Sequence, residues 1–334
     1  MNGETLTADL IFINVGGRAT VPPIPGLDTV PYLTNTSMMD VAFLPRHLVV
    51  LGGSYIGLEF AQMYRRFGSS VTVIEALPRL VPREDEDVSA AITEILIDGG
   101  IEVRTGAKAL AVKRKGEGVA VEIETVQGRA EIEGSHLLVA IGRTPNTKDL
   151  GLDKAGIATD ARGYIVVDDR LRTNVDGVFA LGDCNGRGAF THTSYSEFEI
   201  VAANLLDGES RSLNDRIMAY ALFIDPPLGR CGMTEAEVRK SGRPALMATW
   251  AMERVGRAFE RSETQGFMKI LVDRDTSEML GASILGIGGD EVIHAILDLM
   301  YVRAPYTVLK RAMHIHPTVA EYLPTMLGHL KPLA

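Results

Sequence analysis

Apolar and polar positions follow regular patterns along the chain, most clearly between residues 47 and 75. His47–Leu51 is a short apolar run, Leu58–Phe67 carries apolar residues at helical spacing, and Val71–Ile74 is a second apolar run. Gly68 stands where such a helix is expected to end. A strand, a helix and a strand of this size, about thirty residues in all, predict a βαβ unit and therefore a parallel sheet.

The next segments alternate between helical and extended patterns. Residues 84–106 predict an acidic helix start, an amphipathic helix, a Gly-Gly stop and a strand. Residues 119–142 alternate with a period of two, which predicts antiparallel strands that turn at Gln127–Gly128. An antiparallel sheet is therefore expected beside the parallel one.

Two further apolar runs and a change in the hydrophobic pattern after Ala221 complete the description of the chain. Residues 8–18 and residues 173–183 each hold an apolar run followed by glycine, which predicts a buried strand. From about Ala221 the chain mixes strand and helix patterns with many methionines. We expect a domain boundary near residue 219.

Composition and charge exclude several classes of protein. The chain has 334 residues, 46% hydrophobic and 23% charged, with a net charge of −9 and a pI of about 5.4. These values are typical of a globular protein with more than one domain and argue against nucleic-acid or membrane partners. The N-terminus lacks the features of a signal peptide, and two cysteines indicate a reducing compartment, so a cytoplasmic protein is expected.

The two cysteines show no metal or redox spacing. Cys184 and Cys231 lie far apart in unlike contexts and form no Cys-x-x-Cys pair. With only seven histidines, scattered along the chain, no metal site is expected.

A glycine-rich turn opens the helix of the βαβ unit. Gly52, Ser54 and Gly57 occupy the three positions of a G-x-G-x-x-G pattern, with serine in the middle. Between a strand and a helix, such a turn presents backbone amides and a positive helix end to a dinucleotide pyrophosphate. A purely structural turn without a ligand is the alternative.

Glu75 ends the second strand of the unit. A carboxylate there accepts hydrogen bonds from ribose hydroxyls and repels a 2′-phosphate, which favours NAD(H) over NADP(H). Arg79 and Arg83 lie nearby and favour the phosphate, unless they pair instead with the acidic run Glu84–Asp87.

These motifs occur in the order found in a known family. The chain resembles the pyridine nucleotide–disulfide oxidoreductases, flavoproteins that include dihydrolipoamide dehydrogenase, glutathione reductase and mercuric reductase. The resemblance covers essentially the whole chain and rests on five motifs: "GGSYIGLEFA", "VAIGRTPNT", "TNVDGVFALGD", "FIDPPLGRCGMTE" and "HIHPTVAE".

The resemblance implies the fold class and the domains. It implies an α/β protein in which a Rossmann-type NAD-binding domain accompanies a partial FAD-binding domain and an α+β C-terminal dimerisation domain. The expected divisions are residues 1–37 for the partial FAD-binding domain, 38–146 for the NAD-binding domain, 147–218 for the later part of the FAD-binding domain, and 219–334 for the dimerisation domain.

The resemblance also assigns cofactor-binding residues. Toward NAD it implies that Tyr55 gates the nicotinamide pocket, that Glu59 lies near the nicotinamide and flavin rings, and that Gly142 lines the site. Toward FAD it implies roles for Gly16, for Asp183 on the ribityl chain, and for Thr191 at the start of a helix that faces the flavin. A carboxylate just past a strand end, like that of Asp183, lies where ligands bind in α/β folds.

The motif near the C-terminus resembles an acid–base pair. In the family such a pair serves the active site of the other subunit, so His316 and Glu321 are implied as catalytic residues and a homodimer as the assembly. A residue before proline favours extended backbone, and Pro317 suits the first position of a helix. A histidine that only caps this helix is the alternative.

The sequence lacks one part of the family pattern. It contains neither the flavin G-x-G-x-x-G nor the Cys-x-x-x-x-Cys redox disulfide, so we expect a truncated form of an FAD- and NAD(H)-dependent, mercuric reductase-like oxidoreductase without that disulfide. A non-catalytic NAD-binding dimer and an NADH oxidase or quinone-type reductase are the alternatives. The expected partner is a small-molecule electron acceptor that the sequence does not identify.

Overall fold

The structure, a computed structural model, describes residues 5–333 and divides the chain into two compact units. The first unit combines Met1–Thr20 with Gly142–Arg216, and the second combines Val21–Ile141 with Ile217–Ala334. Each unit therefore joins segments that are distant in the sequence.

The second unit contains the predicted βαβ unit. Its parallel sheet has the strand order β5-β4-β3-β9. The element bounds are β3 His47–Leu51, α2 Tyr55–Phe67, β4 Ser70–Ile74, α3 Glu86–Asp98, β5 Glu102–Arg104 and β9 His136–Val139. Gly68 ends α2 in the left-handed conformation, with φ of 113°, which glycine adopts without steric cost. The prediction of a parallel βαβ unit is confirmed.

The core of this sheet follows from its sequence. Leu48, Val50 and Val73 are fully buried beneath Leu58 of α2 and Ile92 of α3. Strands buried on both faces contain such continuous apolar runs. Beside the sheet lie two short helices, η1 Leu27–Thr29 and α1 Asn35–Met38, and the antiparallel strands β6 Lys108–Lys115, β7 Gly118–Thr125 and β8 Gly128–Gly134.

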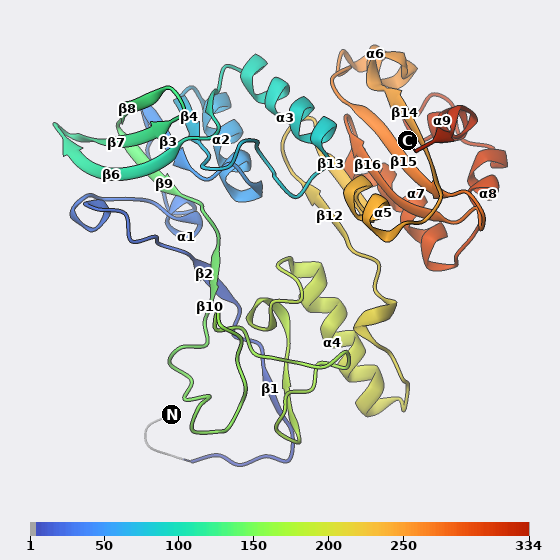
Figure 1. Cartoon of the computed structure of the whole chain (residues 1–334), viewed down its shortest axis with the longest axis horizontal. Coiled ribbons are helices and arrows are strands. Elements are labelled where there is room, and N and C mark those ends of the chain that lie inside the picture. Colours follow the sequence, from blue (N-terminus) through green and yellow to red (C-terminus); the bar gives the residue numbers. More distant parts are fainter. Residues whose placement is uncertain (1–4, 334) are drawn as a thin grey trace. The chain divides into compact units, whose positions relative to one another are not determined.

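A larger sheet fills the C-terminal part of the second unit (Figure 1). Its strand order is β12-β13-β16-β15-β14-β17, and each strand runs antiparallel to its neighbours. Helix α7 packs on β13 and β16. The bounds are β12 Ala219–Leu222, β13 Leu228–Gly232, α5 Glu235–Ser241, β14 Ala245–Ala251, η4 Met252–Arg254, α6 Gly256–Arg261, β15 Phe267–Asp273, β16 Met279–Leu285, α7 Gly289–Tyr301, α8 Tyr306–Arg311, α9 Tyr322–Met326, η5 Leu327–His329 and β17 Lys331–Pro332.

The first unit is built on a parallel pair of strands, β1 and β11, with helix α4 packed alongside. A second, antiparallel pair joins β2 to β10. The bounds are β1 Ile11–Ile13, β2 Gly17–Ala19, β10 Arg143–Pro145, β11 Val178–Ala180, η2 Gly182–Asn185, α4 Thr191–Leu206 and η3 Leu213–Asp215.

One expectation about this unit is wrong. Strand β1 was expected to be buried, but Ile11 is 48% and Phe12 is 50% exposed. Among the described residues β1 pairs with β11 alone, so one edge of the strand has no neighbour within this unit. An apolar run indicates a strand, but it does not say which elements cover it.

Candidate functional site

The turn between β3 and α2 requires its glycines. Gly52 has φ of 113°, and a Cβ there would lie 2.3 Å from the carbonyl oxygen of Ala140. A Cβ on Gly57 would lie 2.0 Å from the carbonyl oxygen of Gly52. The first glycine therefore permits the turn, and the other permits close packing of the helix on the strand.

The start of α2 and the end of β4 together form a place for a nucleotide. Ser54 precedes the helix, and no side chain caps it. Glu75 follows β4, where its Oε2 accepts the Gly53 amide at 2.7 Å and its Oε1 accepts the Leu77 amide at 2.8 Å. The carboxylate is thus fixed beside an uncapped helix start, with lone pairs left for ribose hydroxyls. These groups fit an adenine dinucleotide without a 2′-phosphate.

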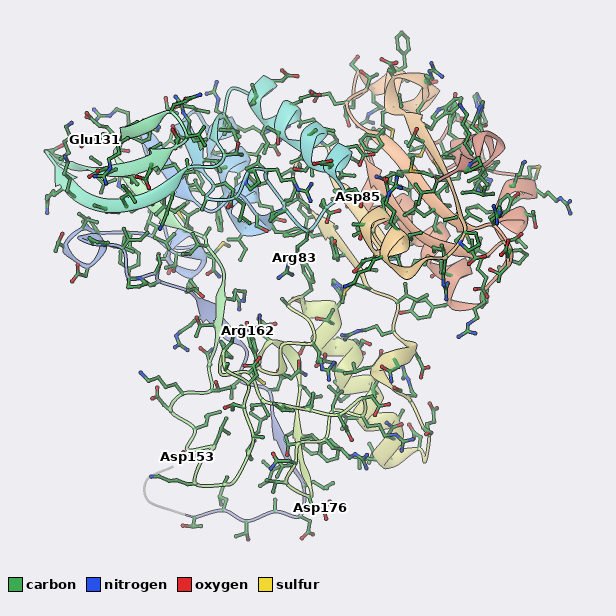
Figure 2. All side chains as sticks on the ribbon, viewed as in Figure 1. Arg83, Asp85, Glu131, Asp153, Arg162 and Asp176 are labelled. Carbon is green, nitrogen blue, oxygen red and sulfur yellow. The ribbon has the colours of Figure 1, made fainter. Side chains whose placement is uncertain are left out.

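The two arginines near Glu75 differ in their contacts. Arg79 donates to the carbonyl oxygens of Pro82 and Glu84, and its Nη1 lies 3.5 Å from Glu86 Oε1. Arg79 therefore pairs with the acidic run, as one of the two alternatives proposed. Arg83 is exposed on the loop between β4 and α3 (Figure 2) and makes no ion pair with any residue that the structure describes.

Tyr55 is the first residue of α2, and its hydroxyl donates to Glu84 Oε1 at 2.7 Å. Tyr220 of β12 donates to the same oxygen at 2.7 Å. Burial, together with the negative charge of Glu84, raises the pKa of both phenols, so both remain protonated at neutral pH. Sequence reasoning missed Glu84 and Tyr220, since a glutamate in the run "REDED" resembles an ordinary solvated charge.

Glu59 lies one turn further along α2. Its Oε1 accepts the amide of Phe223, just past β12, at 2.9 Å. Burial raises the pKa of its carboxyl, although the Phe223 bond opposes this shift. Glu59 thus links α2 to the C-terminal sheet.

In the first unit, the ends of β1 and β11 meet the start of α4. A Cβ on Gly182, which follows β11, would lie 2.7 Å from Asn14 Oδ1 and 2.7 Å from Ser194 Oγ. The carboxyl ends of parallel strands and a helix start form the place where α/β folds bind ligands. Gly16 lies two residues past Asn14 with φ of 66°, in open space. Gly142, expected at the NAD site, belongs to this unit, where its carbonyl accepts the Thr20 amide.

Asp183 lies in this convergence with a cationic partner. Its Oδ2 accepts from Arg143 Nη2 at 2.9 Å and from Nε at 3.1 Å. Helix α4 begins at Thr191 without a side-chain cap. An acceptor, a cation and an uncapped helix start fit the ribityl chain and phosphates of a flavin dinucleotide. Sequence reasoning did not single out Arg143, although it lies in the quoted motif "VAIGRTPNT".

The C-terminal pair has the geometry of an oriented imidazole. His316 Nδ1 lies 3.0 Å from Glu321 Oε2, and the His316 side chain is 81% exposed. The expectation that Pro317 begins a helix is wrong, because α9 begins at Tyr322. The Thr318 amide donates to Glu321 Oε1, and the Glu321 amide donates to Thr318 Oγ1. These two bonds close a separate turn before α9. A carboxylate on one ring nitrogen leaves Nε2 able to accept a proton.

Neither cysteine is accessible. Cys184 lies in the core of the first unit, and Cys231 lies in the core of the C-terminal part of the second. Burial raises the pKa of the Cys184 thiol and raises that of Cys231 to about 12. Over residues 5–333, no helix is long and apolar enough to cross a membrane.

Comparison with known proteins extends this picture. Residues 1–197 match the family model "Pyridine nucleotide-disulphide oxidoreductase", and residues 218–327 match its dimerisation domain. The chain is 39% identical over 323 residues to a probable pyridine nucleotide-disulfide oxidoreductase, RclA, of Escherichia coli, and it is 37% identical over 319 residues to a mercuric reductase of Streptomyces lividans. Those matches cover 96% of this chain and 72% and 67% of the two relatives.

Solved structures agree with the sequence matches. The HOCl-induced flavoprotein disulfide reductase RclA from Escherichia coli, also solved as a Cu(II) complex, superposes with a TM-score of 0.90 at 39% identity. That match covers 96% of this chain and 73% of RclA. LpdA of Mycobacterium tuberculosis superposes with a TM-score of 0.87 at 27% identity, covering 96% of this chain and 69% of LpdA. The chain therefore belongs to the pyridine nucleotide-disulphide oxidoreductases, a family of FAD-dependent enzymes that use NADH or NADPH.

Proposed function

We propose that this protein binds NADH at the turn between β3 and α2 and oxidises it for the reduction of a small-molecule acceptor, as an FAD-dependent homodimer of the mercuric reductase-like type. The observation that carries the proposal is the Glu75 carboxylate, fixed by two backbone amides beside an uncapped helix start. FAD supplies the electron transfer between nucleotide and acceptor.

Different residues are proposed to bind the nucleotide and the flavin. Gly52, Ser54 and Gly57 shape the turn that receives the pyrophosphate, and Glu75 accepts the ribose hydroxyls. In the first unit, Asp183 and Arg143 would hold the polar chain of the flavin, and the start of α4 would face it.

His316 and Glu321 are proposed to handle the proton of the acceptor reaction. Glu321 orients the imidazole through Nδ1, so Nε2 exchanges the proton. Because the His316 side chain is 81% exposed, it is free to serve a second subunit brought in by the dimerisation domain.

The class of acceptor depends on the thiols. The sequence has two cysteines, Cys184 and Cys231, and both are buried. We therefore propose that these two cysteines do not form the redox pair of the disulfide-reductase type, and an NADH oxidase or quinone-type reductase is the alternative. Reduction of a disulfide or a mercuric ion, as the names of the relatives suggest, would need thiols from outside these 334 residues.

The test is the preference between the two nucleotides. Calorimetric titration should give a dissociation constant for NADPH at least about tenfold above that for NADH, which corresponds to about 1.4 kcal/mol. Glu75→Gln keeps one acceptor for the backbone amides of the turn and removes the negative charge. It should therefore reduce the difference in affinity between NADH and NADPH. Glu94→Gln, an exposed carboxylate on α3, is the matched control and should leave the gap unchanged. Equal affinities for the two nucleotides in the wild type would refute NAD preference, and no binding of either would refute the proposed function.

A further inference from the structure

Glu84 is a buried carboxylate whose position next to the nucleotide turn has no role in the function proposed above. It is 2% exposed, and its Oε1 accepts both tyrosine hydroxyls, Tyr55 and Tyr220, at 2.7 Å each. Its other oxygen, Oε2, has no hydrogen-bond partner among the residues that the structure describes. Burying a carboxylate is costly, so a position that retains one needs a reason.

The loop that carries Glu84 packs directly on the nucleotide turn. The amide of Val81 donates to the carbonyl oxygen of Gly53 at 2.8 Å, and a Cβ on Gly53 would lie 2.4 Å from a methyl group of Leu80. Val81 is fully buried with φ of 39°, a conformation that a β-branched residue rarely adopts. The amide of Glu84 then donates to the carbonyl oxygen of Val81. The backbone of this loop therefore places the Glu84 carboxylate next to Tyr55, the first residue of α2.

A buried cation interacts with this carboxylate. Arg230 of β13 is 1% exposed, and the nearby charges of Glu84 and Asp85 raise its pKa although burial opposes the shift. Arg230 Nη1 bonds Asp85 at 3.3 Å, while its Nε and Nη2 have no partner in the described part of the chain. Glu84 thus contributes to balancing a buried positive charge while it holds two phenols.

The two tyrosines come from different parts of the second unit. Tyr55 begins the nucleotide-binding helix, and Tyr220 lies in β12 of the C-terminal sheet. Their rings meet edge to face with centroids 5.6 Å apart. Glu84 therefore joins three elements, the loop after β4, the start of α2 and the edge strand of the C-terminal sheet.

We propose that Glu84 is a positioning residue for the nicotinamide nucleotide, which holds the Tyr55 ring in one orientation at the start of α2 and is itself held by Tyr220. This inference rests on the proposed function, because it needs NADH to bind at that helix start. A ring fixed in advance costs nothing to order when the nucleotide binds, whereas a released ring must be ordered at that moment.

A double-mutant cycle on NADH affinity tests the proposal. We expect Tyr55→Phe and Glu84→Gln each to raise the calorimetric dissociation constant for NADH about fivefold, the change expected when one side chain must be ordered on binding. The double variant should be no weaker than either single variant, since both remove one interaction. Tyr220→Phe leaves the bond between Tyr55 and Glu84 in place, and we expect a smaller change, about twofold.

Two controls separate positioning from general damage to the fold. Tyr64→Phe changes a buried tyrosine on the same helix whose hydroxyl makes no hydrogen bond within residues 5–333, and Glu94→Gln changes an exposed carboxylate on α3. Both should bind NADH as the wild type does, and the unfolding midpoint of every variant is recorded beside its affinity.

The outcomes are distinct. Unchanged NADH affinity in both Tyr55→Phe and Glu84→Gln would overturn the positioning role, as would additive losses in the double variant, while the proposed function would stand. Absence of NADH binding in the wild type would overturn the proposed function and this inference together. Equal losses of NADH affinity in the single variants, with no further loss in the double variant, would support the positioning role of Glu84.

Discussion

At the scale of single residues, the chemistry of the two cysteines is decided by burial. Neither thiol reaches solvent, and burial raises the pKa of both, that of Cys231 to about 12. Because the thiolate is the nucleophile, we expect iodoacetamide at pH 8 to label the native protein negligibly and to label both cysteines after denaturation. Mass spectrometry of the labelled protein measures this. Rapid labelling of Cys184 in the native state would show an accessible thiol and would contradict the assignment.

Residue types with local geometric requirements could be predicted from the sequence. Gly52 and Gly57 sit in a turn whose steric demands are local, and Glu75 is set by its distance from that turn, so the sequence placed all three correctly in the turn and at the strand end. Glu84 and Tyr220 could not be predicted, because 136 positions separate the two residues that share a hydrogen bond. Nothing in a local pattern distinguishes a buried acid from a solvated one.

At the scale of elements, the start of α3 carries acids that hold two buried cations of the C-terminal sheet. Lys269 of β15 is 1% exposed, and its Nζ lies 2.9 Å from Asp85 and 2.7 Å from Asp87. Arg230 also bonds Asp85. The helix is thus tied to the sheet by charge as well as by apolar packing.

Removing one partner of this network should destabilise the protein strongly. Asp85→Asn leaves both cations buried with less compensation, and we expect a loss of about 3 kcal/mol in the free energy of unfolding, measured by urea denaturation. Glu131→Gln is the matched control, because Glu131 pairs with Lys113 and Lys115 on an open strand surface (Figure 2). It should leave the unfolding midpoint unchanged. An equal response of the two variants would contradict a structural role for the buried network.

The same network predicts how stability depends on pH. Burial alone would raise the pKa of Asp85, but Arg230 and Lys269 outweigh it and hold that pKa below its usual value. A depressed pKa means that the contribution of Asp85 is complete above about pH 4, the pKa in the unfolded chain, and is lost as the pH falls through the folded value. The stability gap between wild type and Asp85→Asn should therefore be constant from pH 8 to pH 5 and should narrow below pH 4. A gap that stays constant down to pH 3 would contradict this.

Elements with a clear period were predictable, whereas their surroundings were not. The βαβ unit and the antiparallel strands β7 and β8 match the apolar patterns of their sequences. The burial of β1 and the helix start at Pro317 were predicted wrongly. Burial depends on neighbours that a local run does not encode, and at Pro317 the bonds between Thr318 and Glu321 replaced the expected first turn.

At the scale of the whole molecule, the family and the presence of a dimerisation domain are established, while several expectations remain predictions. The domain limits at residues 37, 146 and 218 are among these, and so are the cytoplasmic location, the truncation and the roles of the site residues. The two compact units show why sequence order is a poor guide to these limits, since each unit combines two separate segments.

The 334 residues of this chain are expected to lack thiol–disulfide chemistry. Disulfide exchange needs a thiolate and a second sulfur within reach, and both cysteines of this chain are buried with raised pKa values. We therefore expect no NADH-dependent reduction of disulfides or mercuric ions when this chain is assayed anaerobically with added FAD. Disulfide turnover on the order of 10 per second that disappears in Cys184→Ala would make Cys184 a redox thiol and contradict the burial argument. Turnover that persists in Cys184→Ala would instead favour the NADH oxidase or quinone-type alternative.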